Sequence, residues 1–238
     1  NYIWPMNAII TGASQGIGKA IAEKLAANGC HLALCSRSIQ KLASLKMDLS
    51  QAYPEINIYI ESVDVTDKAA VLKFASNALK EFKSIDLLIN NAGTFIPGSI
   101  YNEEDGNMEK MIETNLYSAY HLSRAIVPSM IEQKKGHVFN MCSIASHMAY
   151  DNGGSYSISK FALLGFSKCL REEMKPHNVK VTHLMPGATR TPSWDGVDLP
   201  DERFIPAKDI AEIVWSTYTL SQSTNIEDII VRPQLGDI

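Results

Sequence analysis

The chain has 238 residues, of which 45% are hydrophobic and 20% charged, and its formal net charge is -4 at pH 7. This composition is typical of a globular protein, and the slight acidic excess argues against a basic surface for nucleic acid or acidic lipid. Four cysteines occur without CxxC or metal-ligand spacing, which predicts reduced thiols and no bound metal. No signal-peptide pattern or membrane-spanning apolar run is visible, so we expect a cytoplasmic protein whose partners are small molecules.

Short apolar segments alternate with longer amphipathic ones along the whole chain. In chain order, the sequence predicts strands at 7–11, 31–35, 56–63, 85–90, 137–143, 179–185 and 228–232. Helices are predicted between them at 17–28, 39–52, 67–82, about 104–133, 156–174 and 207–221. This alternation predicts an α/β fold, with seven parallel strands flanked by six main helices. No linker divides the chain, so we expect one doubly wound domain over residues 1–238.

Two irregular segments interrupt this rhythm at the ends of predicted strands. One is "IASHMAYDNGGS" at 144–155, and the other is the loop at 188–206, which follows "PG" at 186–187. Open α/β sheets bind their ligands at the carboxyl ends of strands. We therefore expect both segments to border a ligand site, with 188–206 on the substrate side.

A glycine-rich turn, "TGASQGIG" at 11–18, joins the first predicted strand to the first helix. Gly12 can form the tight turn, Gly16 can bring backbone against a pyrophosphate, and Gly18 can let the helix pack closely. The spacing differs from the common GxGxxG, and three glycines can also simply form a turn. The strand and helix on either side favour a nucleotide site.

The end of the second predicted strand indicates which nucleotide is bound. Sites that prefer NAD place a carboxylate there to hold the ribose hydroxyls, whereas Ser36 and Arg37 occupy this position. A guanidinium can bind a 2′-phosphate with two parallel hydrogen bonds, which predicts NADPH. The alternative is that Arg37 is a solvated residue at the start of the next helix.

Five motifs occur in a fixed order: "TGASQGIG", "NNAG" at 90–93, Asn115, Ser143 and "YSISK" at 156–160. With this set the chain resembles the short-chain dehydrogenase/reductase family, over residues 7 to about 232. Ser143 precedes Tyr156 by thirteen residues, which matches the family's spacing. The resemblance implies a Rossmann-type fold and a homodimer or homotetramer that pairs the helices carrying Asn115 and Tyr156.

The resemblance also implies a set of cofactor-binding residues. Besides Tyr156 and Lys160, they are Gly12, Ser14, Gln15, Gly16, Ile17, Gly18, Ser36, Arg37, Asp64, Val65, Asn91, Ala92, Gly93, Pro186, Gly187, Thr189 and Thr191. Many NADPH-dependent members carry a lysine or arginine where this chain has Gln15. NADPH therefore depends mainly on Arg37, and NADH is the less favoured alternative. Asp64 can instead cap the turn that follows its strand.

Four residues form the implied catalytic set. Reduction of a carbonyl needs a hydride, which the cofactor supplies, and a proton, which Tyr156 can donate. A nearby Lys160 ammonium would stabilise the phenolate and lower the pKa of Tyr156, and Ser143 would hydrogen-bond the substrate oxygen. The resemblance gives Asn115 a bound water that links the lysine to solvent. In isolation, a tyrosine and a lysine four apart are more often a packed ring and a solvated amine.

The substrate side of the site is less clearly marked. Ser146, His147, Met148, Tyr150 and Trp194 are placed to line it, and a short, proline-containing 188–206 loop favours a compact substrate. The sequence thus predicts an NADPH-dependent oxidoreductase that reduces a ketone or aldehyde. The alternatives are a 3-oxoacyl carrier protein reductase, an NAD-linked alcohol dehydrogenase and a non-catalytic NADPH sensor.

Overall fold

A computed structural model of the protein describes residues 6–238. Its main sheet has seven parallel strands in the order β3-β2-β1-β4-β5-β6-β9, and it confirms the predicted fold class. The strands are β1 (Asn7–Thr11), β2 (His31–Ser36), β3 (Ile58–Ser62), β4 (Leu87–Asn90), β5 (Gly136–Met141), β6 (Val179–Pro186) and β9 (Asp228–Val231). The order reverses between β1 and β4, which creates the crevice where doubly wound sheets bind ligands.

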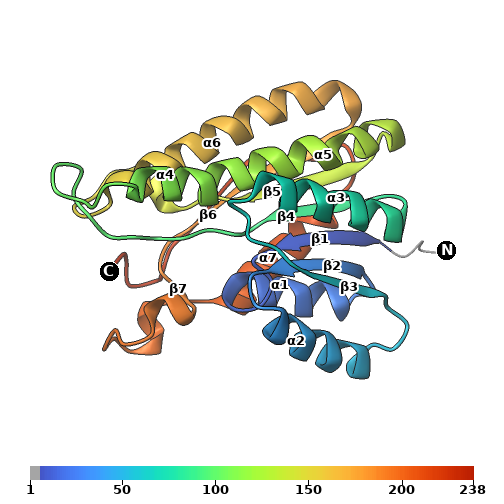
Figure 1. The fold of residues 1–238 in the computed structure, drawn as a ribbon, viewed down its shortest axis with the longest axis horizontal. Helices are drawn as coiled ribbons and strands as arrows, with labels where there is room; N and C mark the ends of the chain where they lie inside the picture. Colours follow the sequence, from blue (N-terminus) through green and yellow to red (C-terminus); the bar gives the residue numbers. More distant parts are fainter. Residues whose placement is uncertain (1–5) are drawn as a thin grey trace.

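Helices cover both faces of this sheet (Figure 1). They are α1 (Gly16–Ala26), α2 (Ile39–Ala52), α3 (Lys68–Phe82), α4 (Asn107–Ile112), α5 (Ser118–Gln133), α6 (Gly154–Met174) and α7 (Ala207–Tyr218). Figure 1 shows α3, α5 and α6 above the sheet and α1, α2 and α7 below it. Within residues 6–238, no helix combines the length and apolar character needed to cross a bilayer.

Two apolar cores lie between the sheet and its helices. In β1, Ala8 and Ile10 pack on the side of α1 and α7, whereas Ile9 packs on the side of α3 and α5. In β4, Leu87 and Leu88 divide between the two cores in the same way. Successive side chains of a strand point to opposite faces, so a central parallel strand must be apolar at every position. This requirement explains the unbroken apolar runs in the sequence.

The predicted helix boundaries need three corrections. The helix expected from 17 to 28 ends at Ala26, because Gly29 has a φ of 77° and the Cys30 amide donates back to the Leu25 carbonyl. The helix expected from about 104 starts only at Asn107, after Gly106 with a φ of 88°. The helix expected to reach 221 ends at Tyr218.

Two local features were absent from the predicted elements. The long helix before β5 contains a π-helical turn at Glu113–Tyr117, between α4 and α5. The loop at 188–206 contains a two-stranded sheet formed by β7 (Thr189–Arg190) and β8 (Ile205–Pro206). The first feature displaces the Asn115 side chain from regular helical spacing, and the second folds the loop back on itself.

Candidate active site

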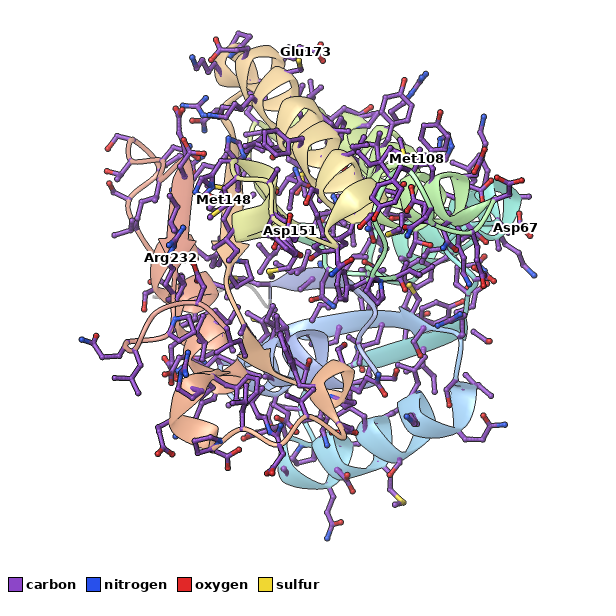
Figure 2. The ribbon with its side chains drawn as sticks, turned by 90° about the vertical axis from the view of Figure 1, so that its left-hand side faces the viewer. Asp67, Met108, Met148, Asp151, Glu173 and Arg232 are labelled. Carbon is purple, nitrogen blue, oxygen red and sulfur yellow. The ribbon has the colours of Figure 1, made fainter. Side chains whose placement is uncertain are left out.

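The predicted site residues gather at the carboxyl ends of the strands. The loops after β4 and β6 lie at the left-hand side of Figure 1, and Figure 2 views the molecule from that side. The predicted cofactor residues lie at or just after five strands: Gly12, Ser14, Gln15, Gly16, Ile17 and Gly18 after β1, Ser36 and Arg37 at the end of β2, Asp64 and Val65 after β3, 91–93 after β4, and Pro186, Gly187, Thr189 and Thr191 at or after the end of β6. Ser143 follows β5, and Tyr156 and Lys160 lie in the first two turns of α6.

The glycine turn is held against the segment after β4. Gly12 and Gly16 have φ values of 64° and 56°, where a side chain would be strained. A Cβ atom on Gly18 would lie 2.4 Å from the Gly12 carbonyl oxygen and 2.5 Å from Asn91 Nδ2. Asn91 Nδ2 itself donates to the carbonyl oxygens of Thr11 and Gly12, at 2.9 and 3.2 Å. The turn therefore has room only for glycine at position 18.

Thr11 fixes this arrangement, although it is not among the site residues predicted from the sequence. Its side chain is buried, and its Oγ1 accepts hydrogen bonds from the amides of Asn91 and Ala92, at 3.0 and 2.9 Å. One hydroxyl thus locks the loop after β4 to the end of β1. Its place at the last position of β1, before Gly12, was the available signal.

The end of β6 packs against the same turn. A Cβ atom on Gly16 would lie 3.1 Å from Thr191 Cγ2, so the Thr191 side chain covers this part of the turn. Thr189 is buried, and its hydroxyl donates to the Gly187 carbonyl at 3.0 Å. These contacts bring the predicted nicotinamide side next to the predicted pyrophosphate turn.

Ser143 and Tyr156 form the centre of the candidate catalytic group. Ser143 Oγ accepts a hydrogen bond from the Ala145 amide at 3.2 Å and interacts with the Tyr156 hydroxyl. Burial raises the pKa of Tyr156 above its ordinary value of 10, and the Ser143 hydroxyl lowers it by a smaller amount. The phenol is therefore protonated at neutral pH, as a proton donor must be.

Lys160 lies beside the phenol ring, and its predicted effect on Tyr156 stays a prediction. Its Nζ is 5.8 Å from the centroid of the Tyr156 ring and donates to the Met141 carbonyl at 2.9 Å. Burial lowers the pKa of Lys160 to about 8. The carbonyl holds the ammonium in place near the Tyr156 ring.

Asn115 connects the loop after β4 to α6. Its Oδ1 accepts from the Thr94 amide at 2.7 Å, and its Nδ2 donates to the Thr94 carbonyl at 3.0 Å and to Ser159 Oγ at 2.8 Å. A Cβ atom on Gly93 would lie 3.3 Å from Asn115 Oδ1 and 3.5 Å from Lys160 Nζ. Oδ1 can accept one further hydrogen bond, which is the capacity that the predicted water requires.

The predicted substrate side needs one correction. Ser146 is fully buried, and its Oγ accepts a hydrogen bond from the Ser143 amide at 3.2 Å. It supports Ser143 from behind and cannot line a substrate pocket. His147 is exposed, and the Trp194 ring packs edge-to-face on Phe204, with centroids 5.3 Å apart. The place of Trp194 on the substrate side stays a prediction.

Two aromatic rings lie next to Tyr156. The Phe95 ring, which is 49% exposed, contacts the Tyr156 ring with centroids 4.9 Å apart and an interplanar angle of 78°. Tyr150 is close enough that Tyr156 contributes to the increase of the Tyr150 pKa to about 12, which burial dominates. Tyr150 was predicted to line the site, whereas Phe95 was missed, although it follows the "NNAG" motif by two positions. Together they form an apolar wall beside the phenol.

A cationic corner lies at the ends of β2 and β3. Lys41, in the first turn of α2, donates through Nζ to Gln15 Oε1 at 2.8 Å. Arg37 precedes the same helix and lowers the pKa of Asp64, although the hydrogen bonds of Asp64 to Thr66 are the larger cause. The Asp64 carboxylate thus caps the next turn, as the alternative reading of the sequence predicted. Position 15 itself carries no cation, but the hydrogen bond to Gln15 brings the Lys41 ammonium next to it.

Comparison with known proteins shows the family to which the chain belongs. The sequence profile described as short chain dehydrogenase matches residues 6–200. An oxidoreductase from Staphylococcus saprophyticus is 34% identical over 231 residues, which cover 95% of this chain and 96% of the relative. Within residues 6–238, no group of three His, Cys, Asp or Glu side chains could hold a metal ion.

The fold is also similar to those of solved dehydrogenase structures. An alcohol dehydrogenase from Thermococcus sibiricus, complexed with 5-hydroxy-NADP, has a TM-score of 0.90, with 28% identity over 97% of each chain. The closed form of a serine dehydrogenase complexed with NADP+ has a TM-score of 0.89, with 28% identity over 98% of this chain and 97% of that one. The chain therefore belongs to the short-chain dehydrogenase family and is an NAD(P)-dependent oxidoreductase that acts on CH-OH or C=O groups.

Proposed function

We propose that this oxidoreductase uses NADPH to reduce a ketone or aldehyde to an alcohol, and that Tyr156 is the proton donor. The observation that carries the proposal is the placement of Ser143 after β5 and of Tyr156 and Lys160 at the start of α6, with Lys160 Nζ 5.8 Å from the centroid of the Tyr156 ring, at the same edge of the sheet as the glycine turn. The residues fit the cofactor, because Gly18 leaves no space for a Cβ and the turn opens α1 toward an anion. We assign the predicted cofactor residues and the catalytic set Asn115, Ser143, Tyr156 and Lys160 to one domain.

The cofactor would supply the hydride, and the chain would supply everything else. The Tyr156 hydroxyl donates its proton to the carbonyl oxygen as negative charge develops there. The Ser143 hydroxyl donates a hydrogen bond to the same oxygen, which stabilises that charge. Lys160 keeps a positive charge near the resulting phenolate, and Asn115 fixes the loop that holds Gly93 against Lys160. The loop at 188–206 would border the substrate.

Product analysis tests this proposal directly. Purified protein, NADPH and a small diketone should yield the hydroxyketone in a one-to-one ratio with the NADPH oxidised, as measured by chromatography and absorbance. An alcohol that forms without NADPH oxidation, or NADPH oxidation without alcohol, would contradict the assignment. Binding of NADPH without any turnover across ketones and aldehydes would favour the sensor alternative.

The preference for NADPH is supported by the charges at the start of α2. Helix N-termini favour anions, yet the first turn of α2 has no acidic residue and carries Lys41 instead, with Arg37 just before it. Within residues 6–238, neither cation forms a salt bridge with a carboxylate. Two cations at a helix N-terminus are unfavourable unless an anion binds, and a 2′-phosphate is such an anion. Several structural neighbours are complexes with NADP or NADPH.

Removal of either cation should weaken NADPH binding selectively. Lys41→Met or Arg37→Met removes a charge-assisted hydrogen bond of about 1.5–3 kcal/mol, so the Kd for NADPH should rise roughly 10- to 150-fold, while the Kd for NADH changes little. Fluorescence titration with each cofactor measures both constants. Lys46→Met, on the same helix, is the control. An equal rise of the Kd for NADPH and for NADH would show that these residues do not bind the 2′-phosphate.

The rate of reduction should fall at mildly alkaline pH. Burial lowers the pKa of Lys160 to about 8, whereas the pKa of Tyr156 is raised above 10. Lys160 is thus the first of the two to lose its proton as pH rises, and the phenolate then loses its neighbouring charge. We expect kcat/KM for reduction to be constant from pH 6 to 7 and to decline above about pH 8. A profile that stays flat to pH 10 would contradict this role of Lys160.

We also propose that two chains associate through α5 and α6. These helices form the outer layer at the top of Figure 1. Four large apolar residues are exposed on this layer: Tyr117 (49%) in the π-helical turn before α5, Tyr120 (36%) on α5, and Ile158 (39%) and Phe161 (46%) on α6. Exposed apolar side chains gathered on one layer are typical of an interface. The resemblance to the family implies pairing of these helices.

A charge placed on this surface should separate the chains. Phe161→Glu would bury a carboxylate in the interface, which is unfavourable without a partner. We expect the variant to have half the mass of the wild type, or less, in light scattering, with Lys175→Glu as a control on the exposed end of the same layer. A wild-type protein that is monomeric at micromolar concentration would contradict the proposal.

A further inference from the structure

The segment that follows β9 crosses the carboxyl edge of the sheet and reaches the candidate active site. Val231 is the last residue of β9 and pairs with Pro186, and its carbonyl accepts a hydrogen bond from the Gly187 amide at 2.8 Å. A Cβ atom on Gly187 would lie 3.2 Å from Pro233 Cδ. Arg232 therefore starts next to the predicted nicotinamide side of the site.

From this position, the Arg232 side chain extends to the loop that follows Ser143. Its Nη2 lies 3.1 Å from Met148 Sδ, and Figure 2 shows the two labelled residues one above the other on this face. The Met148 amide in turn lies 3.3 Å from the Ile144 carbonyl oxygen, one residue after Ser143. The guanidinium thus contacts the loop that follows Ser143.

The partners of this guanidinium leave part of it available. Nη1 forms a salt bridge with Asp237 Oδ2 at 2.9 Å, and the Arg232 side chain is 42% exposed. Among residues 6–238, the one hydrogen-bond partner of Nη2 is the Met148 thioether, which is a weak acceptor for a charged donor. The contact with Asp237 shows that a carboxylate can bind the guanidinium at Nη1. A carboxylate oxygen is a stronger acceptor than the Met148 thioether and can replace it at Nη2.

A second arginine contacts the same C-terminal segment. Arg203 donates through Nη2 to the Asp237 carbonyl at 3.1 Å, so two guanidinium groups approach one residue. Among residues 6–238, Asp237 is the only carboxylate that forms a salt bridge with either arginine. Arg203 and Arg232 therefore both contact Asp237 at this edge of the sheet, while the Phe95 ring provides an apolar neighbour for Tyr156.

We propose that Arg232 binds a carboxylate group of the substrate, so that the enzyme reduces oxo acids to hydroxy acids. This inference rests on the proposed reductase function. The carbonyl carbon gains a hydride from NADPH, its oxygen gains the Tyr156 proton, and the C=O π bond breaks, which leaves a hydroxy acid, NADP+ and a tyrosinate that solvent reprotonates. The carboxylate itself is unchanged and orients the carbonyl, with Arg232 as a specificity-determining residue.

Matched pairs of substrates test the proposal. The wild type is assayed with NADPH on 2-oxobutyrate, 3-oxobutyrate and 3-oxopentanoate, and on the methyl ester of each, which removes only the charge. We expect kcat/KM to be at least tenfold higher for the acid in one pair or more. In Arg232→Met, the acid-to-ester ratio of kcat/KM should fall roughly 10- to 150-fold, mainly through the KM for the acid. Arg232→Lys should restore part of the ratio.

Two further variants distinguish substrate binding by Arg232 from a structural role of its salt bridge with Asp237. Asp237→Asn removes the salt bridge but keeps the guanidinium, so it should retain the preference for the acid. Arg190→Met removes an arginine that pairs with Asp201 elsewhere in the 188–206 loop, and should leave the ratio unchanged. Thermal unfolding of each variant confirms that it is folded.

The outcomes distinguish failure of the Arg232 proposal from failure of the proposed reductase function. The proposal is overturned if no oxo acid is reduced or if kcat/KM for the esters equals that for the acids. It is also overturned if Asp237→Asn loses the preference for the acid over the ester to the same extent as Arg232→Met. Reduction of neutral diketones or aldehydes in that case leaves the proposed reductase function intact. Absence of NADPH-dependent reduction with acids, esters, diketones and aldehydes alike would contradict both.

Discussion

Replacement of Tyr156 by phenylalanine should lower kcat for carbonyl reduction by roughly 10²- to 10⁴-fold, the usual contribution of a positioned general acid. The substitution removes only the hydroxyl that donates the proton. The ring is kept, so its edge-to-face contact with Phe95, at 4.9 Å between centroids, should persist and the fold should be unaffected. Initial rates of NADPH consumption with a small diketone measure the effect.

The Tyr156→Phe variant also has an internal control. Its Kd for NADPH, measured by fluorescence, should stay within about threefold of the wild-type value, because a threefold change corresponds to less than 1 kcal/mol. A variant that retains more than a tenth of the wild-type kcat would show that another group supplies the proton. Ser143→Ala, which removes the hydrogen bond to the substrate oxygen, should cost about 10²- to 10³-fold in the same assay.

Gly18→Ala should impair both stability and cofactor binding. Its Cβ would lie 2.4 Å from the Gly12 carbonyl oxygen and 2.5 Å from Asn91 Nδ2, and the first of these is a backbone atom that cannot rotate away. Overpacking of this kind costs about 1–3 kcal/mol, and the turn must shift where backbone approaches the pyrophosphate. We expect a lower free energy of unfolding in urea and a Kd for NADPH at least tenfold higher.

Lys19→Ala is the matched control for the glycine turn. Lys19 is exposed on the same helix and forms a 3.7 Å salt bridge with Glu23 that is also exposed, so its loss should change stability by less than about 1 kcal/mol. It should leave NADPH binding unchanged. If the Kd of Gly18→Ala for NADPH equalled that of the wild type, the pyrophosphate would not bind at this turn.

The sheet could be predicted from the sequence because its strands are buried on both faces. In β1, Ala8, Ile9 and Ile10 alternate between the two cores, so the apolar run is a direct consequence of the parallel topology. The helix ends were less predictable, since they depend on single positions of positive φ such as Gly29 and Gly106. Amphipathic periodicity carries no information about those positions.

The motifs of the candidate site could likewise be found in sequence, whereas the contacts between distant segments could not. Lys41 meets Gln15 across 26 residues, and Arg232 meets Met148 across 84. Neither pair has a characteristic spacing, because the sheet brings the segments together. Ser146 was wrongly placed on the substrate side for a related reason: its hydroxyl turns inward to the Ser143 amide, which loop position alone does not reveal.

The central claim is that Tyr156 donates the proton in an NADPH-dependent carbonyl reduction. The most direct test is the decrease in near-ultraviolet absorbance of NADPH, with NADH in parallel, for the wild type and Tyr156→Phe against diketones, aldehydes and oxo acids. The account predicts turnover that is faster with NADPH and at least 10²-fold slower in the variant. Equal turnover by the wild type and the variant would contradict it.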